Sequence, residues 1–179
     1  MNLVFGKGQE VNINGFRTSG YFDEREIRVA RNCSDWLSVL VHEYSHFLQW
    51  KYQCSEYSDL KVNGTDCLRI IDDWLNGTEF RPTTIKKAFV KTRRMEKKCE
   101  MLSLMLIRKH TLPIQEEKFV KQANCHIYYY HMMEMTRKRH IRNEMFLSRA
   151  VTRIMPKTFK CRNIHHIPPK VYDIASKTF

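Results

Sequence analysis

The sequence predicts an α+β fold, with a small N-terminal antiparallel sheet followed by a mostly helical region. Residues 1–32 hold short alternating segments separated by turn residues, whereas residues 33–155 carry long segments with apolar side chains at helical spacing. The chain has 179 residues, of which 42% are hydrophobic. A chain of this size buries about 70% of its unfolded surface without disulfides, so we expect one domain, residues 1–179, ending in a tail over residues 156–179.

The sheet region is indicated by alternation and by turn chemistry. Val11-Asn12-Ile13 alternates directly before Asn14-Gly15, a dipeptide typical of tight hairpins. The segment from Gly20 to Ala30 supplies further strand residues in Tyr21-Phe22 and Ile27-Arg28-Val29. A small antiparallel sheet is therefore expected before the first helix.

The first long helix is expected over residues 36–52. Ser34 is a suitable N-cap, Asp35 suits the positive end of the helix dipole, and no Gly or Pro interrupts the segment. Broad apolar flanks enclose a narrow polar strip, which needs a partner elsewhere in the fold. The strip consists of Ser38, His42, Ser45, His46 and Gln49.

The polar strip contains the motif His42-Glu43-x-x-His46, which predicts a metal-dependent hydrolase. Positions 42 and 46 lie one turn apart on the same face, so two imidazoles can bind one zinc ion. Glu43 lies beside them, where a carboxylate can act as general base toward a water activated by the metal. A structural pair of histidines satisfied by core hydrogen bonds is the alternative interpretation.

Four further helices are expected after this motif. Pro113 should break the two longest into a helical hairpin, and Asn76-Gly77 and Pro156 should end two of the others. The expected ranges are residues 66–75, 84–110, 115–140 and 143–155.

The segment Val39 to Leu48 resembles the extended signature of the zincins, a superfamily of zinc metallopeptidases. More loosely, Gly20 to Asp23, His42 to Trp50 and Glu96 to Leu112 together are similar to small predicted metallopeptidases encoded by tailed phages. The resemblance implies a zincin-like domain with one zinc ion per chain and hydrolysis of peptide bonds in a peptide or protein substrate. It also implies an edge strand that binds extended substrate, for which Arg25 to Ala30 is the candidate.

The third metal ligand decides which zincins the chain resembles. Metzincins require Gly at position 49 and His at position 52, where this chain has Gln49 and Tyr52. A gluzincin-like arrangement takes a Glu from a later helix, and Glu96 and Glu100 lie four residues apart on one helical face. Glu100 is favoured as ligand because its apolar neighbours would make an uncompensated carboxylate costly. The alternative is Glu96, because many gluzincins place the ligand Glu one turn before an acidic residue that holds the first His.

The segment from Asn124 to His131 offers a donor for the transition state. Its Tyr and His side chains lie within two helical turns, and His126 or Tyr130 is our candidate for stabilising an oxyanion. An aromatic run at helical spacing is also typical of a protein core. His165 and His166 in the tail are a further candidate for metal binding or for a lid, with a surface loop as the alternative.

The net charge of +12 raises a competing class of function. Basic residues are concentrated in Lys86-Lys87, Lys91 to Lys98 and Arg137 to Arg142, so polyanions should be attracted. We therefore consider weak nucleic-acid association through basic helices and recruitment of acidic substrates. The alternative functions are a basic nucleic-acid-associated protein and a catalytically silent interaction protein stabilised by zinc.

Several features of the sequence also indicate the cellular compartment of the protein. The chain begins without a basic, apolar leader, contains no apolar run long enough to span a membrane, and scatters its six cysteines without a Cys-x-x-Cys pair. We expect reduced cysteines and a cytoplasmic protein that is not secreted, located in the host cytoplasm if the gene is viral.

Overall fold

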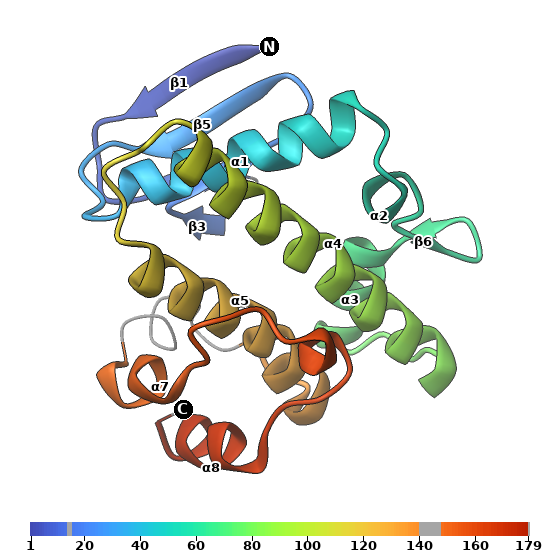
Figure 1. Cartoon of the computed structure of the whole chain (residues 1–179). Coiled ribbons are helices and arrows are strands. Elements are labelled where there is room, and N and C mark those ends of the chain that lie inside the picture. The colour runs from blue at the N-terminus through green and yellow to red at the C-terminus, as the bar shows by residue number, and fades with distance from the viewer. Residues whose placement is uncertain (14–15, 140–147, 179) are drawn as a thin grey trace.

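The computed structural model describes residues 1–13, 16–139 and 148–178. A small sheet covers helix α1 (Trp36–Lys51) at one end (Figure 1). Helices α4 (Pro82–Lys109) and α5 (Glu116–Thr136) run through the middle, and helices α7 (Arg149–Ile154) and α8 (Pro169–Thr178) lie at the other end (Figure 1). The α+β class and the order of sheet first and helices second are confirmed.

The N-terminal sheet is mixed, so the prediction of an antiparallel sheet is wrong in part. It contains β1 (Asn2–Gly6), β4 (Gly20–Phe22) and β5 (Glu26–Ala30) in the order β1-β5-β4. Strand β5 pairs antiparallel with β4 but parallel with β1, with Leu3 opposite Ile27 and Phe5 opposite Val29. Parallel pairing is allowed because residues 7–25 form a long crossover between β1 and β5.

The segment Arg25 to Ala30, predicted to be an edge strand, contains β5, which is the central strand of this sheet. Val29 and Ala30 are fully buried, as expected for a strand with a neighbour on each side. Among the described strands of this sheet, β1 and β4 are the edges.

A separate hairpin stands beside the sheet. Strand β2 (Val11–Ile13) pairs antiparallel with β3 (Phe16–Thr18), in agreement with the hairpin expected here. The predicted turn residues Asn14 and Gly15 lie outside the described residues.

Helix α1 (Trp36–Lys51) carries the His42-Glu43-x-x-His46 motif, as predicted. Its N-cap residue is Asp35 rather than Ser34, and no side chain caps the helix. The Asp35 carboxylate is engaged elsewhere, since Lys118 Nζ donates to it at 2.6 Å and Gln122 Nε2 at 3.1 Å. Asp35 thus ties the start of α1 to the helix α5.

A short connection leads from α1 to the long helices. It contains α2 (Ser55–Ser58), the two-stranded β6 (Lys61–Val62) and β7 (Thr65–Asp66), and α3 (Cys67–Leu75). Helix α3 agrees with the expected range, and Asp66 caps it by accepting the Arg69 N–H at 3.0 Å.

The predicted helical hairpin is formed by α4 (Pro82–Lys109) and α5 (Glu116–Thr136), which pack against each other with Pro113 in the turn between them. Helix α5 ends before the predicted residue 140. Arg137 takes the left-handed conformation, with φ of 51°, and its N–H bonds Met133 O. This αL residue closes the helix.

The C-terminal part contains α7 (Arg149–Ile154), a 3₁₀ turn η1 (Cys161–Ile164) and α8 (Pro169–Thr178). Residues 143–147 of the expected fourth helix lie outside the described residues. Of the segment expected to be a tail, η1 and α8 are helical. Val171 and Ala175 of α8 are buried in the main hydrophobic core with residues of α3, α4 and α5.

The structure also bears on the expectations of reduced cysteines and of a chain without membrane-spanning helices. Cys33, Cys54, Cys67, Cys99 and Cys125 are all free thiols. Within the described part of the chain, none of the helices has both the length and the apolar character that crossing a membrane requires.

Candidate metal centre

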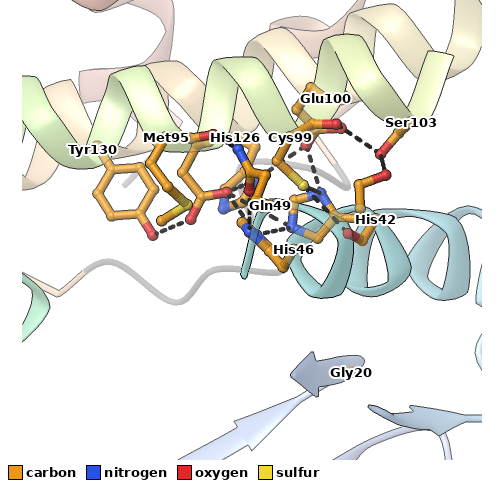
Figure 2. A network of polar contacts seen from close by, with 12 residues as sticks. Gly20, His42, His46, Gln49, Met95, Cys99, Glu100, Ser103, His126 and Tyr130 are labelled. Carbon is orange, nitrogen blue, oxygen red and sulfur yellow. Dashed lines mark hydrogen bonds and ion pairs between the residues drawn. The ribbon is translucent and has the colours of Figure 1, made fainter. Parts of the chain in front are cut away.

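Helix α1 presents His42 and His46 on the same face, with 3.1 Å between their Nε2 atoms. His46 is buried and the His42 side chain is 12% exposed. Figure 2 shows both rings directed from α1 toward α4. The polar strip of α1 thus meets α4, where Ser45 Oγ lies 2.8 Å from Ser103 Oγ.

Glu96 of α4 completes a triangle of donor atoms with the two histidines. Its Oε2 lies 3.7 Å from His42 Nε2 and 3.4 Å from His46 Nε2. The Tyr130 hydroxyl donates to the other oxygen, Oε1, at 3.1 Å. No hydrogen bond reaches the buried Oε2 among the described residues, and a buried carboxylate oxygen without a partner is costly.

Glu100 contacts the opposite nitrogen of the first histidine. Its Oε1 lies 3.1 Å from His42 Nδ1 and 3.3 Å from His126 Nδ1. An Nδ1–H donor to this carboxylate leaves the lone pair of His42 Nε2 directed at the donor triangle.

Gln49 performs the same task for His46. His46 Nδ1 donates to Gln49 Oε1 at 2.9 Å, and Gln49 Nε2 donates to Met95 O at 3.1 Å. The amide is fully buried, so both its groups are satisfied inside the protein. Sequence reasoning placed Gln49 in the polar strip but assigned it no role.

Cys99 is a second residue that sequence reasoning missed. Its thiol donates to His42 O at 3.3 Å, and the sulfur lies 3.6 Å from His42 Nδ1. The side chains of His42, His46 and Cys99, and those of His42, Glu100 and His126, form two groups that could hold a metal ion. The available signal was spacing, because positions 96, 99, 100 and 103 share one face of α4.

The charges of this centre are strongly coupled. Burial would lower the pKa of His42 and of His46, but both pKa values are well above the ordinary value. Cys99 and Glu100 raise the pKa of His42, and Cys99 and Glu96 raise the pKa of His46. Burial would raise the pKa of Glu96, yet His126 and His46 hold it well below its usual range. The pKa of Glu100 falls to about 2 despite burial, because His42 and His126 lie beside it. A metal cation would replace the imidazole protons, so its binding should release protons.

Glu43 lies beside the donor triangle and faces the sheet. It is 7% exposed, and a Cβ atom at Gly20 of β4 would come within 3.4 Å of its Cγ. Figure 2 places Gly20 on the side of α1 away from α4. The Glu43 side chain therefore approaches β4 at Gly20 and lines both cavities next to that strand.

Two cavities meet at Gly20, His42 and Glu43. The larger cavity, of about 1150 Å³, runs between the β2–β3 hairpin and α5 and reaches Glu100 and His126. The smaller cavity, of about 530 Å³, runs toward the end of α1 and reaches His46, Glu96 and Tyr130. The smaller volume is typical of ligand pockets and the larger is slightly above that range, and the candidate centre lies where the two cavities join.

The structure brings together all the residues that the sequence nominated for the site except the tail histidines. His126 and Tyr130 of α5 both contact the carboxylates, and their role as transition-state donors stays a prediction. His165 and His166 are exposed, and neither belongs to the metal-binding groups found among the described residues.

Comparison of this chain with protein-family models, with curated proteins and with solved structures finds no match. The functional assignment therefore depends on the geometry of the residues themselves.

Proposed function

We propose that this protein is a zinc-dependent metallopeptidase. The supporting observation is the spacing of His42 Nε2, His46 Nε2 and Glu96 Oε2, which lie 3.1, 3.4 and 3.7 Å apart. Tetrahedral zinc with bonds of about 2.0–2.1 Å separates its ligand atoms by about 3.3 Å. Three donors at this spacing would hold a zinc ion with a fourth position left for water or substrate, as in catalytic zinc sites.

Glu96 is the better candidate for the third ligand, although its neighbours in the sequence favoured Glu100. Glu96 Oε2 approaches the Nε2 atoms of both histidines, whereas Glu100 Oε1 approaches Nδ1 on the far side of His42. The unsatisfied Glu96 Oε2 also fits a cation. Glu100 then acts as the carboxylate that orients the first histidine.

Zinc, when bound, supplies a Lewis acid that polarises a carbonyl and lowers the pKa of a coordinated water to about 7. The chain's own residues supply the rest of the chemistry. Glu43 removes the proton from the attacking water and passes it to the leaving amine. Gln49 and Glu100 hold the two imidazoles in the required tautomer, and Tyr130 fixes the Glu96 carboxylate through Oε1.

The substrate platform in this proposal is β4, in place of the segment from Arg25 to Ala30. Strand β4 pairs with β5 alone among the described strands, and Gly20 lines both cavities. An extended peptide can add to such an edge by main-chain hydrogen bonds. The scissile bond would then pass beside Glu43.

The test compares the wild-type protein with Glu43→Gln and His46→Ala. Native mass spectrometry measures zinc content, and a peptide library analysed by mass spectrometry measures cleavage. We expect one zinc per chain and cleavage for the wild type, zinc without cleavage for Glu43→Gln, and loss of both for His46→Ala. Undiminished cleavage by Glu43→Gln would refute the assigned base.

The same experiment separates the alternative functions. Zinc binding without any cleavage by the wild type would favour a zinc-stabilised interaction protein, and purification without zinc would favour the nucleic-acid-associated protein.

Several residues of the basic segments are paired internally, as Lys91 is with Asp59 and Arg137 with Glu79. This pairing reduces the charge available to a polyanion.

A further inference from the structure

We propose that the smaller cavity binds a basic side chain of the substrate, so that cleavage occurs close to Lys or Arg. This inference rests on the proposed function, since it names the substrate class of the same site. The cavity joins the metal centre at His46 and Glu96 and extends to Tyr57 and Asp66. A side chain next to the scissile bond can enter it.

The charged groups at the far end of this cavity are mainly acidic. Glu24 and Asp66 line it together with a single cation, Lys61. Neither carboxylate forms an ion pair among the described residues, and the hydrogen bond found for Asp66 is the cap of α3. Lys61 lies opposite Asp66 in the β6–β7 pair, so one ammonium stands against two exposed carboxylates and the local charge stays negative.

The larger cavity differs from the smaller one in how its carboxylates are paired. Its wall also carries two carboxylates outside the metal centre, Glu10 and Asp35. Glu10 lies 3.9 Å from Arg17, and Asp35 accepts from Lys118 Nζ at 2.6 Å. Both are therefore compensated by the protein, so the two cavities differ in free negative charge.

An aromatic side chain, Tyr57, lines the smaller cavity close to both acidic groups. Tyr57 is half-buried, and burial together with the carboxylates of Glu24 and Asp66 raises the pKa of Tyr57 to about 12. Trp50 and Tyr130 add aromatic surface to the same cavity. A guanidinium or ammonium group is recognised by this combination of aromatic faces and carboxylates.

The net charge of +12 had favoured acidic substrates, but the local charges oppose that expectation. Charges more than a Debye length away, about 8 Å at physiological salt, are largely screened. The groups lining the cavity therefore decide which side chain it accepts.

Binding and cleavage test this inference separately. Fluorescent peptides that differ at one position, Arg, norleucine or Glu, are titrated against zinc-loaded Glu43→Gln, and the wild type is given a peptide library. We expect the Arg peptide to bind about tenfold more tightly than the norleucine peptide, as two carboxylates and a cation–π contact allow. Cleaved bonds should share a basic residue at one fixed position.

The double change Glu24→Gln with Asp66→Asn should remove most of this preference, because Asn still caps α3 while both charges are lost. Glu10→Gln in the larger cavity is the control and should leave the preference intact. Equal binding of the three peptides, or equal loss of preference in the control, overturns the inference. Preferential binding of the Arg peptide without any cleavage by the wild type would contradict the peptidase proposal alone. Cleavage without a preference for basic residues would contradict this inference alone.

Discussion

Replacing Glu96 by Gln tests the assignment of the metal centre most directly. The change keeps the side-chain volume but removes the negative charge of the carboxylate. In the wild type, Glu96 Oε2 lies 3.4 Å from His46 Nε2. Structural zinc sites bind with about 10–16 kcal/mol, so each of three protein ligands accounts for about 3–5 kcal/mol. Loss of one ligand should therefore weaken zinc binding by a factor of about 10² to 10⁴.

The matched variant is Glu100→Gln, one helical turn along α4. Glu100 contacts His42 Nδ1 at 3.1 Å, and changing a residue that orients a ligand typically weakens metal affinity about 10–100-fold. Competition with a chromophoric chelator at pH 7 measures both dissociation constants, and circular dichroism of the metal-free proteins checks that both fold. A greater loss of affinity in Glu100→Gln than in Glu96→Gln would refute the reasoning and restore Glu100 as the ligand.

Three further predictions concern neighbouring features. The pKa of His131 is lowered to about 4 from 6.5, first by burial and then by a nearby cation, so its stabilising effect is complete above pH 6.5 and is lost as the pH falls toward 4. Urea unfolding with a chelator present measures the free energy of unfolding. Between pH 6.5 and pH 4 the wild type should lose about 3 kcal/mol more of it than His131→Gln. Gly20→Ala should cost about 1–3 kcal/mol in the same assay, because the new Cβ would lie 2.5 Å from Val39 Cγ1. Gln49→Leu should weaken zinc binding about 10–100-fold, because His46 loses the acceptor for Nδ1.

Each of these three predictions has an outcome that contradicts it. Equal losses of stability in the wild type and the His131 variant would mean that His131 is not held neutral. An unchanged urea midpoint for Gly20→Ala would mean that β4 and α1 are less closely packed than described. Zinc affinity unaffected by Gln49→Leu would show that the tautomer of His46 is fixed by another group.

The parts of the fold that the sequence predicted are those encoded locally. Helix α1 follows from an uninterrupted apolar and polar pattern, and the end of α3 follows from the stop signal Asn76-Gly77. The parallel pairing of β1 with β5 involves residues more than 20 positions apart, and no local pattern specifies it. The central place of β5 has the same origin, since it depends on which strands arrive on either side.

The candidate site shows the same division. The spacing of His42 and His46 predicts their approach to each other, because one helix carries both. The choice between Glu96 and Glu100 depends on how α4 is rotated against α1, which is fixed by contacts such as the Gln49 Nε2 bond to Met95 O. A sequence read one helix at a time offers only the neighbours of each carboxylate in the chain, and these favoured Glu100.

The distance along the chain between the donors has a consequence for folding. His46 and Glu96 are 50 positions apart (96 − 46), and α1 and α4 are otherwise joined by side-chain packing and buried polar contacts. An ion shared by the two helices would act as a reversible cross-link, comparable to a disulfide closing a loop of that length, for which chain entropy gives about 4 kcal/mol. The supply of metal in the cell would then govern how long the protein survives proteolysis as well as whether it works.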